Sequence, residues 1–119
     1  MKERLVMKER KEEMVTNASY LYVVRMDVAP DHEEEFNRNY DTEHIPTVLK
    51  APGMISAARF ETSDTSVPKY VAIYEMEGPD VPFTKEFRAL ADSGEWPQRV
   101  RPYTSNHSRV VYKRIVSGT

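Results

Sequence analysis

Residues 20–46 read YLYVVRMDVAPDHEEEFNRNYDTEHIP, and within this stretch the spacing of apolar residues changes from that of a strand to that of a helix. Over residues 20–28 the side chains alternate between two faces. One face carries Tyr22, Val24, Met26 and Val28, and the other carries Leu21, Val23, Arg25 and Asp27. This pattern predicts a β-strand with large apolar side chains on both faces.

A helix is expected to begin directly after this strand. Pro30 suits the first turn of a helix, and Asp31 and Glu34 have the spacing of a capping box. Every fourth residue then carries a ring, and these side chains share one stripe of the helix: Phe36, Tyr40 and His44.

The end of this helix is predicted from a proline. Ile45 precedes Pro46, and the residue before a proline is disfavoured in helical backbone. We therefore expect the regular helix to end near His44, with one further turn around residues 46–50. The pair Pro52-Gly53 then marks a turn.

The remaining elements follow from the same rules. Residues 55–62, 69–77 and 104–115 have strand patterns, residues 81–91 have helical spacing, and residues 63–68 and 93–102 are expected loops. The element order is β-α-β-β-α-β. It predicts an α+β, ferredoxin-like fold in which two helices cover one face of a four-stranded antiparallel sheet.

Size and composition limit the class of protein. The 119 residues suit one domain, here residues 18–119, preceded by a charged N-terminal extension over residues 1–17. There is no cysteine, no apolar run of membrane-spanning length and no apolar core of a secretory signal, so we expect a cytoplasmic protein. A net charge of −2 gives no support to nucleic-acid binding.

The predicted sheet has apolar side chains on both faces, but two helices cover only one. Leu21 and Val23 oppose Tyr22 and Val24, while Val71 and Ile73 oppose Tyr70 and Tyr74 in the third strand. An exposed apolar face of this kind usually marks an interface. We therefore predict a homodimer that forms through the sheet face.

The element order, the Phe36-x-x-x-Tyr40-x-x-x-His44-x-Pro46 stripe and the Pro52-Gly53 turn resemble the dimeric α+β barrel superfamily, and within it the EthD-like group. The resemblance covers about residues 20–116. It implies two sheets that close into a barrel across a dimer, and a small pocket in each subunit between helices and sheet. Such proteins include cofactor-free monooxygenases, cyclases and isomerases, and some relatives bind haem.

His44 is the first candidate for catalysis, with Tyr40 one turn before it. An inward-pointing histidine in a partly apolar cavity can titrate near neutral pH and act as an acid or base. Tyr40 can donate a hydrogen bond to a substrate oxygen. The structural alternatives are a histidine that ends the helix and a core aromatic ring. Asp41 and Glu43 are expected to be solvated charges or, less directly, to orient His44.

Several further side chains are candidates for binding a substrate. Arg59 could pair with a substrate anion or with a carboxylate. Tyr70 and Tyr74 flank the small Ala72 on one strand face, and His107 stands on the last strand beside Asn106. The predicted substrate-binding set is Phe36, Arg59, Tyr70, Tyr74 and His107.

Three basic or aromatic residues, Trp96, Arg99 and Arg101, lie in the last predicted loop as a lid, an anion clamp or a basic surface. His32 is expected to face solvent. No two of His32, His44 and His107 have ligand spacing on one element, so no metal site is predicted. The spacing does not bear on haem, which a single histidine can ligate.

Three functions remain open from the sequence. The first is a cofactor-independent enzyme that uses His44 as an acid or base on a small, apolar, oxygenated compound. The second is a non-catalytic carrier or sensor of a small ligand. The third, RNA binding on the same element order, lacks the usual glycine-aromatic signature at residues 69–74.

Overall fold

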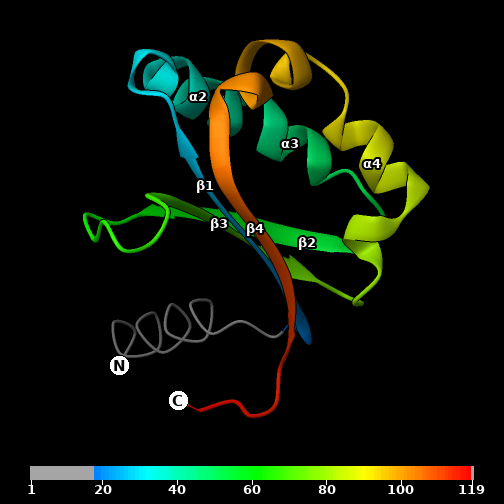
Figure 1. Ribbon diagram of the computed structural model, residues 1–119. Coiled ribbons are helices and arrows are strands. Elements are labelled where there is room, and N and C mark those ends of the chain that lie inside the picture. The colour runs from blue at the N-terminus through cyan, green and yellow to red at the C-terminus, as the bar shows by residue number, and fades with distance from the viewer. Residues whose placement is uncertain (1–17, 119) are drawn as a thin grey trace, which may run out of the picture.

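Four antiparallel strands form one sheet, and the helices lie on one of its faces (Figure 1). The computed structural model describes residues 18–118, so the extension expected over residues 1–17 lies outside the described residues. The strands are β1 (Tyr20–Val28), β2 (Met54–Glu61), β3 (Tyr70–Met76) and β4 (Thr104–Lys113), in the order β2-β3-β1-β4. The predicted ferredoxin-like α+β topology is confirmed.

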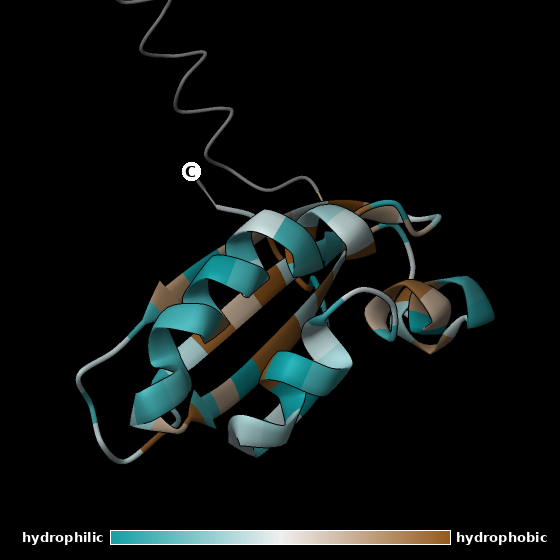
Figure 2. Ribbon diagram, turned by 90° about the horizontal axis from the view of Figure 1, so that it is seen from above, coloured by the Kyte–Doolittle hydropathy of each residue, from teal (hydrophilic) through white to brown (hydrophobic). Residues whose placement is uncertain are grey.

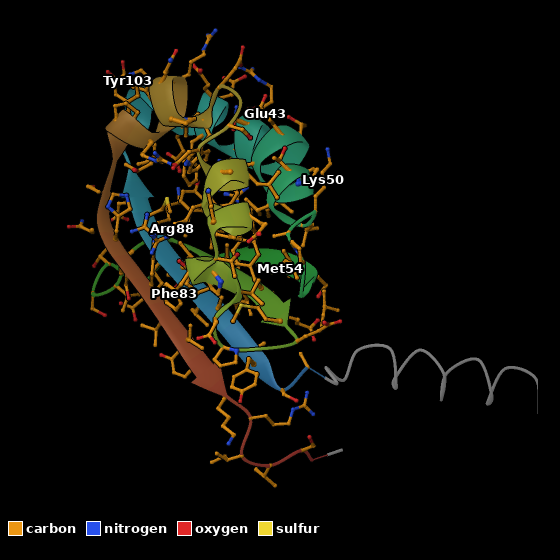
Figure 3. The ribbon with its side chains drawn as sticks, turned by 90° about the vertical axis from the view of Figure 1, so that its right-hand side faces the viewer. Glu43, Lys50, Met54, Phe83, Arg88 and Tyr103 are labelled. Carbon is orange, nitrogen blue, oxygen red and sulfur yellow. The ribbon has the colours of Figure 1, made fainter. Side chains whose placement is uncertain are left out.

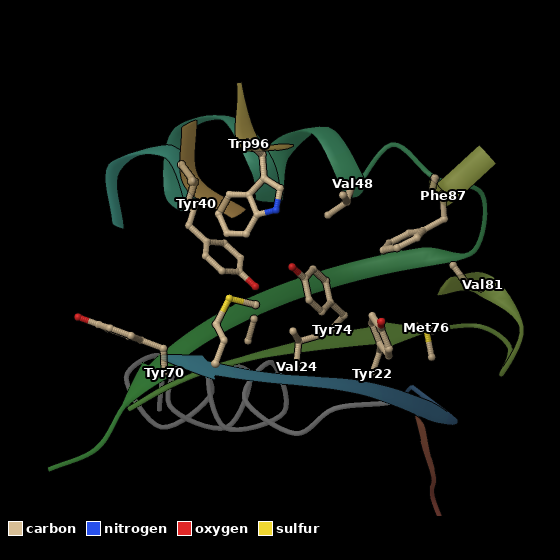
Figure 4. Packing of buried hydrophobic residues seen from close by; sticks show 14 of the residues in the cluster. Tyr22, Val24, Tyr40, Val48, Tyr70, Tyr74, Met76, Val81, Phe87 and Trp96 are labelled. Carbon is tan, nitrogen blue, oxygen red and sulfur yellow. The ribbon is translucent and has the colours of Figure 1, made fainter. Parts of the chain in front are cut away.

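The two central strands carry the core. In β1 and β3, Tyr22 pairs with Tyr74 and Val24 pairs with Ala72, so alternate side chains point together toward the helices. The apolar cluster between sheet and helices also contains Phe36, Tyr40, Val48, Phe87, Trp96 and Val100. Figure 4 shows Tyr40, Val48, Trp96 and Phe87 above the strands. Seen from above, the outer turns of the helical layer are hydrophilic, and hydrophobic positions lie on the strands beneath it (Figure 2).

The first helix differs from the prediction at both ends. It begins with the 3-10 turn η1 (Pro30–His32), and neither η1 nor α2 (Glu33–Asn39) has a side-chain cap, so the predicted capping box is wrong. It also does not end at His44. A π-helical turn, η2 (Tyr40–His44), joins α2 directly to α3 (Ile45–Val48).

The π turn explains how the helix passes Pro46. Ile45 stays helical, with φ −60° and ψ −51°, and its N–H donates to the carbonyl of Tyr40, five residues earlier. A π turn widens the helix by one residue, which rearranges the backbone hydrogen bonds where proline supplies no N–H. The preference against helix before proline is overridden here.

The second helical segment is divided at Thr84. The 3-10 turn η3 (Val81–Phe83) ends at Thr84, whose extended backbone breaks the predicted helix. The side chain of Thr84 then accepts a hydrogen bond from Phe87 N and caps α4 (Lys85–Ala91). The predicted loop over residues 93–102 contains a second π turn, η4 (Trp96–Val100), and the 3-10 turn η5 (Arg101–Tyr103).

The sheet face away from the helices is apolar near its centre. There Val23 of β1 pairs with Ile73 of β3 and with Val110 of β4. Phe60 and Tyr112 lie farther out on the same face and are exposed. No helix among residues 18–118 has both the length and the apolar composition to cross a bilayer.

Candidate functional site

The two π turns pack against each other and bring three rings together. The imidazole of His44 is stacked on the indole of Trp96, with ring centroids 4.2 Å apart and an interplanar angle of 20°. Tyr40 meets both rings edge to face, at 5.3 Å from His44 and 4.8 Å from Trp96. We call this set, Tyr40, His44 and Trp96, the ring cluster. π turns within helices occur frequently at functional sites.

A pair of tyrosine hydroxyls lies at the sheet side of the ring cluster. Tyr40 and Tyr74 point their hydroxyl groups toward one another (Figure 4), and Tyr74 donates a hydrogen bond to Tyr40. Burial raises the pKa of both phenols, and the bond from Tyr74 partly offsets this rise at Tyr40.

His44 is neutral at physiological pH. Burial lowers the pKa of its imidazole from the ordinary value of 6.5 to about 4, and the positive charge of Arg101 lowers it further than Glu43 raises it. The expectation that His44 titrates near neutral pH is therefore wrong. The physical reason is that the rings around it replace water, which disfavours the charged imidazolium.

Glu43 holds the chain segment that leads into η4. Its carboxylate accepts a hydrogen bond of 2.7 Å from the backbone N–H of Glu95, and Figure 3 shows it beside this segment at the top of the helical layer. Gly94 adopts a φ of +70°, and a Cβ built there would lie 2.2 Å from Glu43 Oε1. The predicted role of Glu43 as a solvated charge is thus wrong, since it positions the turn that carries Trp96.

Arg59 joins the ring cluster from the edge strand β2. Its guanidinium carbon lies 4.4 Å from the ring centroid of Tyr40, and it donates hydrogen bonds to Asp41 Oδ1 at 2.6 Å and to Asn37 Oδ1 at 2.7 Å. The predicted carboxylate partner of Arg59 is Asp41. Asp41 therefore neither orients His44 nor stands as a free charge.

The other predicted substrate residues divide into two groups. Phe36 is fully buried and contacts Tyr40, Tyr70 and Trp96, so it belongs to the same aromatic layer. Tyr70 is also buried, and its hydroxyl donates to Glu33 and accepts from Asn37. These contacts bring Phe36, Arg59, Tyr70 and Tyr74 close to the ring cluster.

His107 is not part of the ring cluster. It is exposed on β4, and its Nε2 lies 2.7 Å from the hydroxyl of Thr104. Its neighbour Asn106 has a φ of 55° at an irregularity of the strand and donates to Asp27. At such an irregularity neighbouring side chains need not alternate between the two faces of the strand.

Trp96, Arg99 and Arg101 do not form the lid or the anion clamp that were two of the expectations for the last loop. Trp96 is a buried core residue, while Arg99 pairs with Glu35 at 3.0 Å and Arg101 pairs with Asp92 at 2.8 Å. His32 is half-buried, and its ring is stacked on the exposed ring of Tyr103 with centroids 3.4 Å apart. Tryptophan is the largest apolar side chain, and its size alone was a signal for the core.

Among the described residues, no group of three or more His, Cys, Asp or Glu side chains could hold a metal ion. The donors needed for such a site are dispersed. Asp41, Glu43 and His44 follow one another on the helix, but Arg59 and the backbone of Glu95 engage the two carboxylates.

The structure is similar to several solved structures. A protein assigned as an antibiotic biosynthesis monooxygenase from Bordetella bronchiseptica is 19% identical with a TM-score of 0.63, over 82% of this chain and 99% of that one. A variant of MhuD, a haem degrader of Mycobacterium tuberculosis, with two manganese protoporphyrin IX groups in each active site, is 12% identical with a TM-score of 0.65, over 84% and 98%.

An EthD family protein from Bacillus halodurans is 10% identical with a TM-score of 0.57, over 81% of this chain and 99% of that one. No protein-family model and no curated protein matches the sequence. At these identities the likeness concerns the fold. The chain has an α+β, ferredoxin-like fold, which it shares with these solved structures.

Proposed function

We propose that the protein binds a small oxygenated aromatic or polyketide-like compound at the ring cluster and acts on it as a cofactor-independent enzyme with His44 as the base. The observation that carries the proposal is the meeting of two π turns, which holds a neutral histidine against Trp96 and Tyr40. Ionisable side chains with strongly shifted pKa values gather at functional sites. This fold hosts several chemistries, so the proposal rests on these side chains.

The low pKa of His44 determines which substrate protons it can accept. A base whose conjugate acid has a pKa of about 4 is fully unprotonated at pH 7 but weak, so the substrate must have an acidic proton. A phenol, a hydroxyquinone or a carbon between two carbonyl groups meets this requirement. The charge of Arg101, which lowers the pKa of His44, equally favours the substrate anion that forms.

Tyr40, on the same helix, is the proposed hydrogen-bond donor to the substrate oxygen. Its pKa is raised, so it keeps its proton, and Tyr74 already donates to its oxygen. In the proposed reaction Tyr40 therefore donates its O–H to the enolate or phenolate oxygen while His44 holds the proton removed from the substrate. The ligand reaches both groups after displacement of Trp96 from the face of His44.

A non-catalytic carrier is the second candidate, and one observation favours it. Trp96 stacks on one face of His44, so a flat aromatic ligand that displaced the indole could stack on the imidazole in its place. Aromatic walls with few polar groups are typical of small-molecule sites. The carrier predicts binding that depends on Trp96 and a bound compound that is recovered unchanged.

The ring cluster does not fit a haem. Phe36, Tyr40 and Trp96 are each at most 4% exposed and fill the layer between helices and sheet beside His44. The proposed substrate needs Trp96 alone to move, whereas a porphyrin ligated by His44 is too large for the space of one indole. No step of the proposed reaction therefore passes through a haem.

Replacement of His44 tests the proposed reaction. We expect His44→Ala to reduce turnover of an active phenol, quinone or 1,3-dicarbonyl by about 10²–10⁴-fold, the usual contribution of a general base. His107→Ala is the matched control, because His107 is exposed and outside the ring cluster. Wild-type turnover should be independent of pH above about 5, since His44 is deprotonated there.

The assay begins with a thermal-shift screen of phenols, quinones, 1,3-dicarbonyl compounds, lactones and short fatty acids. A ligand that raises the melting temperature of wild type but not of His44→Ala defines the compound class for turnover. Equal turnover in wild type and His44→Ala would remove His44 from the mechanism. Binding without turnover in any class would favour the carrier.

We also propose that two copies associate through the sheet face away from the helices. This face is apolar at Val23, Ile73 and Val110, and Phe60 and Tyr112 stand exposed on it. Contiguous apolar patches on a protein surface mark interaction sites. The helical layer already covers the opposite face, so this one remains for a partner.

Phe60→Asp tests the dimer. It places a charge on the proposed interface. We expect light scattering at micromolar concentration to show a dimer for wild type and a monomer for the variant, whose dimer dissociation constant should be at least about tenfold higher. Phe83→Asp is the control, because Phe83 has almost the same exposure, 57% against 55%, but lies on η3 (Figure 3). A wild-type monomer would contradict the proposal.

A further inference from the structure

A groove lies between the first helical segment and the edge strand β2, outside the ring cluster. Its volume is about 530 Å³. Polar side chains form one part of its lining, Asn37, Asp41 and Arg59, and apolar side chains form another, Ile45, Ala57 and Phe60. The proposed reaction at His44 uses none of this lining.

Arg59 is the most buried charge in the groove. Its side chain is 13% exposed, and its guanidinium carbon lies 4.4, 5.5 and 5.3 Å from the ring centroids of Tyr40, Tyr70 and Phe36. Such contacts attract a cation and hold the plane of a guanidinium in one orientation. Arg59 is therefore fixed with its donors directed along the groove.

The counter-ion of Arg59 is much less fixed than Arg59 itself. Asp41 accepts through a single oxygen, Oδ1, and its side chain is 60% exposed. Guanidinium groups bind carboxylates most strongly through two parallel hydrogen bonds. Because Arg59 makes a single hydrogen bond to the exposed Asp41, the pair lacks these two parallel hydrogen bonds, and a ligand carboxylate could form them instead.

The far side of Arg59 is held by a chain of hydrogen bonds. Arg59 donates to Asn37 Oδ1, Asn37 Nδ2 donates to the hydroxyl of Tyr70 at 3.2 Å, and Tyr70 donates to Glu33. Glu33 also pairs with Lys69 at 2.6 Å. These bonds keep Arg59 in place when Asp41 is released, so the anion site is present before a ligand arrives.

We propose that this groove is a second binding site, which takes a small organic carboxylate with an apolar body. The ligand carboxylate replaces Asp41 on Arg59 and binds both outer nitrogens, while the apolar body lies against Ile45 and Ala57, which are not part of the proposed dimer interface. Asp41 occupies the carboxylate position when no ligand is bound. The site is independent of the proposed reaction at His44.

The experiment compares phenylacetate with its neutral isostere phenylacetamide by isothermal titration calorimetry on the full chain. We expect wild type to bind phenylacetate and to bind phenylacetamide at least about tenfold more weakly, since the amide has no charge for Arg59. Asp41→Asn should tighten phenylacetate binding about three- to fivefold, because it removes an exposed competing carboxylate. Glu86→Gln, which makes the same charge change on α4, is the control.

Arg59→Gln should abolish the preference for the carboxylate over the amide. Circular dichroism checks its fold, and Arg59→Lys provides a second variant that keeps the charge but not the two parallel bonds, with at least about tenfold weaker binding. The proposal is overturned if phenylacetate does not bind, binds no better than the amide, or gains nothing from Asp41→Asn. His44→Ala should bind phenylacetate like wild type, so failure of this site and failure of the proposed reaction are distinguishable.

Discussion

Replacing Trp96 with alanine is expected to lower the free energy of unfolding by about 3–5 kcal/mol, the largest effect of any single substitution considered for this protein. Trp96 is 4% exposed and contacts the rings of Phe36, Tyr40 and His44. Alanine removes the whole ring and leaves a cavity that the sheet below cannot close. Because a domain is stabilised by only about 5–15 kcal/mol, this variant should be close to unfolding at 37 °C.

Urea unfolding followed by circular dichroism measures this effect. Trp96→Phe is the matched variant, since it keeps an aromatic ring in the layer and should lose clearly less stability than Trp96→Ala. A second control is Tyr103→Ala, because Tyr103 is exposed and stacks on His32 outside the ring cluster. A loss below about 1 kcal/mol for Trp96→Ala would show that the indole is not part of the core.

The second large effect is the dependence of stability on pH. His44 has a pKa of about 4 in the folded protein and 6.5 as its ordinary value. The unfolded chain therefore takes up a proton at His44 before the folded chain does. Stability is fully present above pH 6.5 and is lost as pH falls through the folded pKa, by about 3 kcal/mol in total.

This loss can be isolated by comparing wild type with His44→Gln between pH 4 and pH 8. Wild type should lose about 3 kcal/mol more than the variant over this range, since carboxylates that titrate at low pH are common to both. His107→Gln serves as the control for a histidine exposed on the last strand. Parallel stability curves for wild type and His44→Gln would mean that the imidazole remains accessible to water.

Much of the candidate site could be predicted because it lies on one helix. The spacing of four residues between Phe36, Tyr40 and His44 placed these rings on one inward stripe, and the structure confirms that Phe36 and Tyr40 are buried there. The strand pattern likewise placed Tyr70 and Tyr74 on one face, and the structure shows that this face meets the helices. Both inferences use only the geometry of a single element.

The contacts between elements could not be predicted in the same way. Trp96 lies 52 residues after His44 in the chain, and nothing in local periodicity indicates that their rings stack. Glu43 was expected in solvent because its partner is a backbone N–H on a distant turn. The pKa of His44 was misjudged for the same reason, since its burial depends on Trp96.

Sequence periodicity by itself determined the element order, the sheet with two apolar faces and the ring stripe of the first helix, because these depend on repeats of two and about four residues. Tertiary structure alone decided that the helix continues through Pro46 as a π turn, that a second π turn covers His44, and that Arg59 faces Asp41. Each of these depends on how packing brings together segments that are far apart in the chain. Packing overrides the local backbone preference before Pro46, and the burial of His44 keeps its imidazole uncharged.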